Sequence, residues 1–299
     1  MPSEAKLEEL DLRAWVERAP RTQKGFREAV HIILTAISTS AELSSKMVMK
    51  GGLLLAIRYD STRFTKDADF STRDRYAPGA EKSLLAELDQ QLVLSNEQLP
   101  YDTVCRRQKT EIRPARTDSL YPTLSLSIGY APRSNTKALA RLQAGQIPTV
   151  VEIDYSYNEA VLDIDVLGLG DGEALRAYSF LNLLAEKMRS LLQQPIRNRY
   201  RQQDVYDLHL LLTNCKPISS AEADDLLRLL VTSCAERGIV ATQTSLADAQ
   251  VRAMAAEGYD KLRAEVDGDL PLFDVSYELV QRFYSELPCS QKSTPAGSQ

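Results

Sequence analysis

The stretch from Lys50 to Ser71, KGGLLLAIRYDSTRFTKDADFS, constrains this chain more than any other. Its order predicts a strand over 47–49, then two glycines that open a short helix over 53–57, then a second strand at Asp67. Glycines at the start of a helix leave backbone N–H groups uncovered and let a phosphate come close. The first half of the stretch therefore predicts a phosphate-binding turn.

Two aspartates, Asp67 and Asp69, begin the second expected strand. Residues i and i+2 of a strand point to the same face, so the two carboxylates are expected side by side. Like charges that close repel, and one takes up a proton unless a cation lies between them. Mg²⁺, which is held by a few carboxylates and by substrate phosphate oxygens, suits such a pair. Either motif alone is more often a plain turn or a solvated strand end, and their order favours a nucleotide-handling site.

This order of motifs resembles the DNA-polymerase-β-like nucleotidyltransferase superfamily. More narrowly, KGG at 50–52 followed by RFTKDADF at 63–70 resembles the KGG…RxSxDxD signature of the AbiEii/MenT-like toxin nucleotidyltransferases. Thr65 stands where that family often has Ser, and Ala68 where it often has Ile. The resemblance implies that Asp67 and Asp69 are catalytic metal ligands. It also implies a set of nucleotide-binding residues: Lys50, Gly51, Gly52, Arg63 and Thr65.

A further strand is expected over 149–157, TVVEIDYSY, because apolar and polar residues alternate there. Two-metal sites often take a third carboxylate from a neighbouring strand. Asp154 is the candidate for this third metal ligand, ahead of Glu152. The alternative is a half-exposed strand with acidic residues on its wet face, which the alternation explains equally well.

A helix expected over 178–194 contains LLAEKMRSL at 183–191. Beside an apolar stripe, a lysine such as Lys187 usually extends to water. The segment also resembles the family's LxAEKLxAL motif, and this resemblance implies that Lys187 is a catalytic residue that binds triphosphate. An ammonium group suits that task, because it is a compact positive charge.

The next stretch, 195–212, combines a basic loop with a helix that starts at Gln202. Its segment RQQDVYDL at 201–208 resembles the family's RDxxDL motif, which makes Asp204 a catalytic candidate that contacts the nucleotide or holds the lysine. The alternative is a first-turn acid that complements the helix dipole. The arginines of the loop are predicted to contact an RNA backbone, with Tyr200 available for stacking. They are Arg197, Arg199 and Arg201.

The patterns predict an α+β chain with two domains. Residues 1–172 are expected to form the polymerase-β-like nucleotidyltransferase domain, a mixed sheet with flanking helices that starts with a helix over 3–16. Residues 173–288 are expected to form a mainly helical C-terminal domain, and 289–299 a disordered tail.

Composition limits the functions open to the chain. With a formal net charge of −5, it must contact nucleic acid through a local basic patch. Its two histidines argue against a His-based metal centre, and its four cysteines, without CxxC spacing, argue for a reducing compartment. No apolar run is long enough to span a membrane, and the N-terminus is too charged for a signal peptide, so a cytoplasmic protein is expected.

The resemblance implies a Mg²⁺-dependent enzyme that transfers a nucleoside monophosphate from an NTP to an RNA 3′ end, often a tRNA acceptor stem. It implies a growth-arresting toxin whose partner is a separately encoded antitoxin, for which a winged-helix protein is expected. Two alternatives stay open. The acceptor could instead be a protein or small-molecule hydroxyl, or the chain could be a non-catalytic nucleotide-binding module, although the intact Asp-x-Asp pair argues against the latter.

Overall fold

The computed structural model describes residues 8–115, 119–170 and 173–288. The chain forms two compact units. Unit 1 comprises the residues up to Ser179 together with Glu265–Asp267, and unit 2 comprises Phe180–Ala264 and the residues from Gly268 onward. The expected disordered tail, 289–299, lies outside the described residues.

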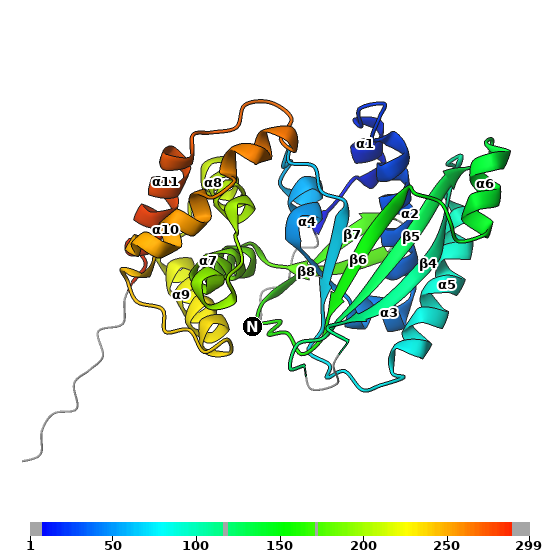
Figure 1. Ribbon diagram of the computed structural model, residues 1–299. Coiled ribbons are helices and arrows are strands. Elements are labelled where there is room, and N and C mark those ends of the chain that lie inside the picture. Colours follow the sequence, from blue (N-terminus) through cyan, green and yellow to red (C-terminus); the bar gives the residue numbers. More distant parts are fainter. Residues whose placement is uncertain (1–7, 116–118, 171–172, 289–299) are drawn as a thin grey trace, which may run out of the picture. The chain divides into compact units, whose positions relative to one another are not determined.

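Unit 1 is built on an eight-stranded mixed sheet with the strand order β1-β7-β8-β2-β3-β6-β5-β4 (Figure 1). The pairs β1–β7, β2–β8 and β3–β6 are parallel, and the other neighbours are antiparallel. The predicted α+β class with a mixed sheet is therefore confirmed. The strands are β1 (Glu8–Glu9), β2 (Val48–Lys50), β3 (Asp67–Ser71), β4 (Thr103–Arg113), β5 (Thr123–Pro132), β6 (Val150–Ser156), β7 (Ile164–Gly170) and β8 (Glu173–Tyr178).

Helices flank this sheet. α2 contacts β4, β5, β6 and β8, while α5 contacts β4 and α3 contacts β8. α2 forms the centre of the core, because its residues from Ala29 to Ser38 are all buried. Each aliphatic side chain buried there stabilises the fold by about 1.5–3 kcal/mol. The helices of unit 1 are α1 (Leu12–Glu17), α2 (Lys24–Thr39), α3 (Ala41–Lys46), α4 (Gly51–Arg58), α5 (Glu81–Gln98) and α6 (Thr136–Gln143).

The alternation of β3 separates its apolar side chains from its acidic ones. Ala68 and Phe70 are 1% and 0% exposed and belong to the core. Asp67 and Asp69 therefore lie on the opposite face, since successive strand residues point to opposite sides. This pattern, which the sequence predicted, places both carboxylates on the polar face of the sheet.

The regular secondary structure in the described residues of unit 2 is all helical, as the sequence predicted. α7 contacts α8, α9 and α10, and α8 contacts α11. A capping box, in which Ser219 and Glu222 satisfy each other's backbone N–H groups, starts α9. The elements are α7 (Phe180–Arg197), α8 (Gln202–Asn214), α9 (Ser220–Ala235), η1 (Ser245–Ala247), α10 (Ala249–Ala256), η2 (Tyr259–Ala264) and α11 (Phe273–Ser285).

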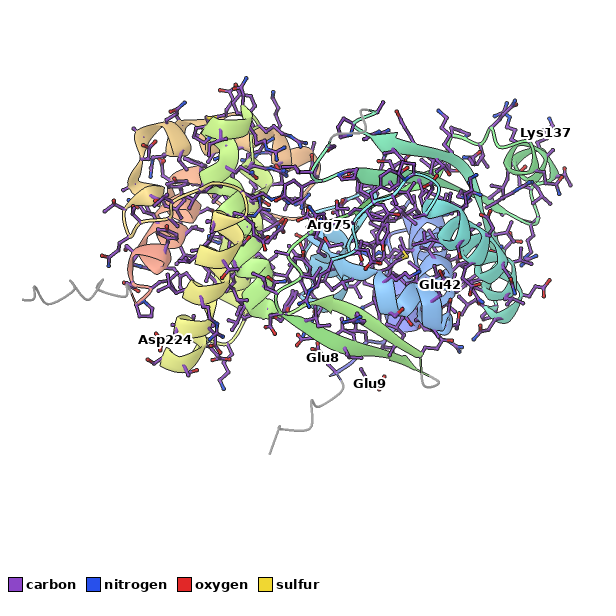
Figure 2. The ribbon with its side chains drawn as sticks, turned by 90° about the horizontal axis from the view of Figure 1, so that it is seen from below. Glu8, Glu9, Glu42, Arg75, Lys137 and Asp224 are labelled. Carbon is purple, nitrogen blue, oxygen red and sulfur yellow. The ribbon has the colours of Figure 1, made fainter. Side chains whose placement is uncertain are left out.

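The N-terminal segment differs from the helix expected over 3–16. Residues 3–7 lie outside the described residues, and Glu8 and Glu9 form a short strand that pairs with β7 at the edge of the sheet (Figure 2). The helix starts only at Leu12, where the Asp11 carboxylate accepts a hydrogen bond from the Ala14 N–H at 2.8 Å. An N-cap bond of this kind fixes the first turn, so the apolar stripe begins later than its spacing suggested.

The division between the units falls after Ser179, whereas the sequence placed it at residue 172. The cause is β8, which the sequence did not predict. β8 pairs with β7 and β2 and so belongs to the sheet of unit 1.

The burial of His31 leads to a prediction of how the stability of the protein depends on pH. It is 4% exposed, and its Nδ1 lies 2.8 Å from the Tyr101 hydroxyl. Burial, with a smaller effect of Arg13 partly offset by Asp11, lowers its pKa to about 4. The unfolded chain, with a His pKa of about 6.5, thus binds more protons than the folded chain between about pH 4 and pH 6.5. We expect the free energy of unfolding to fall as the pH drops from about 6.5 to about 4, by up to about 3 kcal/mol.

Urea unfolding curves across this pH range would test the expectation in the wild type and in His31→Leu. The second histidine, His209, also has a pKa lowered by burial and titrates in both proteins. The difference between the two pH profiles therefore isolates His31. Profiles of equal slope would contradict the assignment.

Candidate active site

The turn between β2 and α4 brings a glycine against an aspartate. Gly51 has a φ of +75°, a conformation that side chains rarely allow. A Cβ atom at this position would lie 2.1 Å from Oδ2 of Asp69. Lys50 pairs directly with Asp69 in the antiparallel β2–β3 ladder. The helix start and the Asp-x-Asp strand are thus held in contact, as the sequence predicted.

The second glycine accommodates two further side chains. A Cβ atom on Gly52 would lie 2.8 Å from Nη2 of Arg63 and 3.4 Å from Cγ2 of Thr65. The side chains of Arg63 and Thr65 therefore lie over the first turn of α4. The structure gathers five of the six residues expected to bind the nucleotide at this turn, and the sixth, Lys187, belongs to α7. The five are Lys50, Gly51, Gly52, Arg63 and Thr65. Their role in binding stays a prediction.

Four acidic residues face one another across the parallel β3–β6 pair. Asp67 is opposite Glu152 and Asp69 is opposite Asp154. Partial desolvation, then the charges of Asp154 and Glu152, raise the pKa of Asp67, and the opposing effects of Arg63 and Lys66 are smaller. This face thus carries a concentration of negative charge that a bound cation would relieve.

Hydroxyl groups from β5 orient the two acids of β6. Ser125 donates to Asp154 at 2.6 Å, and Ser127 donates to the two carboxylate oxygens of Glu152 at 3.0 and 2.7 Å. Both candidates for a third carboxylate therefore lie beside the Asp-x-Asp pair. The register places Asp154 next to Asp69.

The donor set suits Mg²⁺ with a limited share of protein ligands. Among the described residues, no group of three or more His, Cys, Asp or Glu side chains is arranged to hold a metal ion. Mg²⁺ is often bound by only one or two carboxylates plus substrate phosphates and water. Asp67 and Asp69, beside a turn that is predicted to bind phosphate, fit that mode. The role of Asp154 as a third ligand stays a prediction.

The loop that carries Arg63 is held by a segment distant in sequence, residues 265–267. The Phe64 N–H donates to the Glu265 carbonyl oxygen at 2.7 Å, and an antiparallel bridge joins Arg63 to Val266. The Glu265 carboxylate lies 3.6 Å from Nη1 of Arg63, whose side chain is 10% exposed. Sequence reasoning missed this segment, because no periodicity or motif marks it.

The second constellation is a buried ion cluster inside unit 2. The Lys187 ammonium group on α7 donates to Asp204 at 3.2 Å and to Asp207 at 2.7 Å, both on α8. The side chains of Lys187, Asp204 and Asp207 are 4%, 8% and 1% exposed. Lys187 is therefore directed to acids of its own unit and not to water, and its predicted contact with triphosphate is not tested by these contacts.

The charges of this cluster are strongly coupled. Burial alone would lower the pKa of Lys187, but Asp207 and Asp204 raise it above the ordinary value. Burial raises the pKa of Asp204 despite the nearby lysine. Its Oδ2 atom is buried without a hydrogen-bond partner within the described part of the chain. A charged lysine between two acids thus joins α7 to α8, which supports the predicted alternative that Asp204 holds the lysine.

The three arginines predicted to bind RNA lie close together in unit 2. Arg197 ends α7, which continues through Pro195, and Arg201 is the N-cap of α8. The charges of Arg201 and Arg197, with burial between them in size, lower the pKa of Arg199. Arg197 and Arg199 are exposed, as is Tyr200. The cluster is thus a local basic patch of the kind that composition required, and RNA binding stays a prediction.

Comparison with known proteins settles the family. A sequence model of the nucleotidyl transferase AbiEii toxin of type IV toxin–antitoxin (TA) systems matches residues 32–282. The chain belongs to the AbiEii family. This AbiEii chain is therefore a nucleotidyltransferase and a toxin of a TA system, with a nucleotide as substrate and an antitoxin as partner. None of the described helices has the length and apolar character needed to cross a bilayer.

Solved structures similar to the AbiEii chain include two from Helicobacter pylori. JHP933 is 17% identical with a TM-score of 0.49, and the match covers 89% of this chain and 93% of that one. A protein described as a candidate nucleotidyltransferase is 13% identical with a TM-score of 0.34, and the match covers 84% and 100% of the two chains. A search of curated proteins found no match.

Substituting Gly51 tests the turn of the AbiEii chain. Gly51→Ala forces a side chain into a left-handed conformation, at a cost of about 1–2 kcal/mol, and also displaces the Asp69 carboxylate. We expect NTP binding, measured by calorimetry, to weaken by more than tenfold. Gly145→Ala is the matched control, because Gly145 has a φ of +68° but no atom within 4 Å of the added Cβ.

Both variants should lose stability through backbone strain, and only Gly51→Ala should lose nucleotide binding. Equal NTP affinity in the two variants would show that the Gly51–Asp69 contact does not shape the site.

Removing the buried lysine tests the ion cluster. Lys187→Met leaves two carboxylates buried without their cation, so we expect the free energy of unfolding to fall by about 3–5 kcal/mol. Adding Asp204→Asn and Asp207→Asn removes the uncompensated charges and should recover most of the loss. Lys137→Met, at an exposed position of α6 (Figure 2), is the control and should change stability by at most about 0.5 kcal/mol.

Chemical denaturation of the four proteins measures these differences. A Lys187→Met protein as stable as the wild type would exclude the ion cluster as a structural element. Its lysine would then be available for the triphosphate.

Proposed function

We propose that this AbiEii toxin is a Mg²⁺-dependent cytoplasmic enzyme that transfers a nucleoside monophosphate from an NTP to an RNA 3′ end, with a tRNA acceptor stem as the favoured acceptor. The transfer would block the RNA and arrest growth. One observation carries the catalytic part of the proposal: the glycine-opened start of α4 lies in contact with the carboxylate of Asp69. A phosphate-binding turn and an acidic pair then share one site.

In this proposal, several residues of unit 1 each make a different contact with the triphosphate of the NTP. Uncovered backbone N–H groups at Gly51 and Gly52 bind phosphate oxygens. The Arg63 guanidinium group lies over the same turn and neutralises charge on the triphosphate. Lys50, whose ammonium group lies 5.8 Å from the centre of the Tyr178 ring, adds a second cation at the end of β2. The hydroxyl of Thr65 supplies a further hydrogen bond.

The acidic pair prepares the reacting phosphate. Asp67 and Asp69 would hold Mg²⁺, which would supply charge stabilisation at the α-phosphate and activation of the attacking hydroxyl. Asp154 supports the pair from β6, where the hydrogen bond from Ser125 fixes its orientation. In-line displacement then depends mainly on positioning and on charge stabilisation by these side chains.

Unit 2 supplies the surface for the RNA acceptor in this proposal. Arg197, Arg199 and Arg201 offer positive charge for phosphates, and Tyr200, which is 53% exposed, offers a ring for base stacking. With a net charge of −5 the chain as a whole does not attract RNA, so the contact requires a local patch of this kind. We propose a winged-helix protein as the cognate antitoxin, on the resemblance that the sequence motifs carry.

Lys187 and Asp204 act in this proposal as a unit. The ion contacts support a positioning role in which Asp204 and Asp207 fix the lysine between α7 and α8. A direct contact of Lys187 with the triphosphate stays part of the proposal, and it requires that the ammonium group exchange a carboxylate for a phosphate oxygen.

Incubation with labelled NTPs, Mg²⁺ and total RNA tests the function. We expect label on RNA with the wild type, and a loss of at least about a hundredfold with Asp67→Asn or Asp69→Asn, since each removes a charge that holds the metal. Asp224→Asn is the control, because Asp224 is exposed on α9 (Figure 2) and should leave transfer unchanged.

Three outcomes bear on the proposal. Transfer that persists in the Asp67 and Asp69 variants would refute the catalytic assignment. Label found on protein or a small molecule, and not on RNA, would move the acceptor to that class. Nucleotide binding without release of pyrophosphate would indicate a non-catalytic module.

A further inference from the structure

A pocket of about 320 Å³ opens in unit 1 beside the loop that carries Arg63 and Thr65. Its walls come from α1, the start of α2, one side of α4, the 60–65 loop and Asp267. This volume lies at the small end of the range for ligand pockets, about 300–1,000 Å³. Its lining includes Trp15, Arg18, Gln23, Phe26, Arg27 and Arg63.

Three guanidinium groups line this pocket. Arg27 lies over the Trp15 ring, 4.6 Å from its centre, and donates to the Trp15 carbonyl oxygen at 2.7 Å. Burial and the charge of Arg18 lower the pKa of Arg27, so the two cations repel each other. Arg18 reaches Asp60 only at 3.8 Å, with both side chains well exposed, and a pair of that kind holds its partners weakly. An anion between the arginines would relieve their repulsion.

The backbone adds to this preference for an anion. Gln23 lines the pocket and is the N-cap of α2, a helix of 16 residues. Its side chain makes no capping bond. The N-terminus of a helix carries partial positive charge, which favours anions nearby. The arginines and the helix dipole therefore both favour an anion in the pocket.

The contacts of Gly51 and Gly52 show where the pocket lies relative to the turn between β2 and α4. Asp69 touches Gly51, and Arg63 and Thr65 touch Gly52, the next residue. Arg63 and Thr65 also line the pocket, together with Leu53 on the following turn of α4. The pocket thus adjoins the proposed phosphate-binding turn at Gly52, through Arg63 and Thr65, and neither Asp67 nor Asp69 lines it.

We propose that this pocket receives the pyrophosphate leaving group, the two outer phosphates of the NTP. The inference rests on the proposed function, in which the α-phosphate lies at Asp67 and Asp69. The acceptor oxygen bonds to the α-phosphorus and its proton passes to solvent, while the bond from the α-phosphorus to the bridging oxygen breaks. The electron pair leaves with that oxygen, so the added negative charge appears on pyrophosphate, toward Arg63, Arg27 and Arg18.

Ligand binding in the pocket can be followed by tryptophan fluorescence, because Trp15 lines the pocket and is the single tryptophan of the chain. Inorganic pyrophosphate is titrated into the full-length protein without divalent metal, and Trp15 emission is followed. We expect a saturable change in emission, since an anion that contacts Arg27 alters its stacking on the indole ring. In Arg18→Gln the dissociation constant should rise about tenfold, which is the loss expected for one charge-assisted contact.

Arg13→Gln is the matched control. Arg13 lies at the start of α1, the helix that Arg18 caps at its C-terminal end, and does not line the pocket, so the same charge is removed without the contact. Its affinity for pyrophosphate should match the wild type. Equal weakening in both variants, or no saturable signal, would overturn the proposal. A response that depends on Arg18 with an oligoribonucleotide but not with pyrophosphate would overturn it as well, and assign the pocket to an RNA backbone.

The titration separates this inference from the proposed function. Pyrophosphate binding that depends on Arg18, without any transfer to RNA, would leave the pocket standing and remove the RNA acceptor. Transfer that requires Asp67, with pyrophosphate affinity insensitive to Arg18, would leave the function standing and remove the pocket.

Discussion

The contact between the backbone of Gly51 and the carboxylate of Asp69 sets the geometry of the proposed site. Because Gly51 has no side chain and a positive φ, α4 can start directly at the end of β2 with the Asp69 carboxylate against its first residue. The pairing of β2 with β3 then fixes the acidic pair relative to the helix N–H groups. The groups for phosphate and metal are thus placed by one turn, and neither can shift without the other.

The carboxylate clusters of the two units differ in the charges that surround them. In unit 2, Asp204 and Asp207 are buried around Lys187, so the protein itself supplies a cation that offsets part of their charge. In unit 1, the acids of β3 and β6 face one another across a strand pair, and at Asp67 the effect of neighbouring acids and desolvation exceeds that of nearby cations. Charge that a protein leaves uncompensated at a surface is available to a ligand. The contrast supports the proposal that a metal ion would bind at the β3–β6 face and not at the lysine cluster.

Local patterns predicted the parts of the fold that local forces determine. The alternation around Ala68 and the glycines before α4 are short-range signals, and both led to the right elements and to the candidate site. β8 was missed, because a strand of six residues held by pairing with two strands from distant parts of the chain has no local signature. The burial of Lys187 was missed for a similar reason. A lysine beside an apolar stripe usually extends to water, and only the packing of α8 against α7 brings two acids to it.

The 265–267 segment also contributes to the site, because it holds the loop that carries Arg63. It belongs to unit 1 by its contacts, yet the chain on both sides of it belongs to unit 2. Its backbone pairs with the loop at Phe64, and its Glu265 carboxylate lies beside Arg63. Two covalent connections from unit 2 therefore lead into the segment that pairs with the loop of Arg63 and Phe64. Displacing this segment would break the hydrogen bond at Phe64 and move the Glu265 carboxylate away from Arg63, so residues 265–267 help to set the position of the Arg63 guanidinium group.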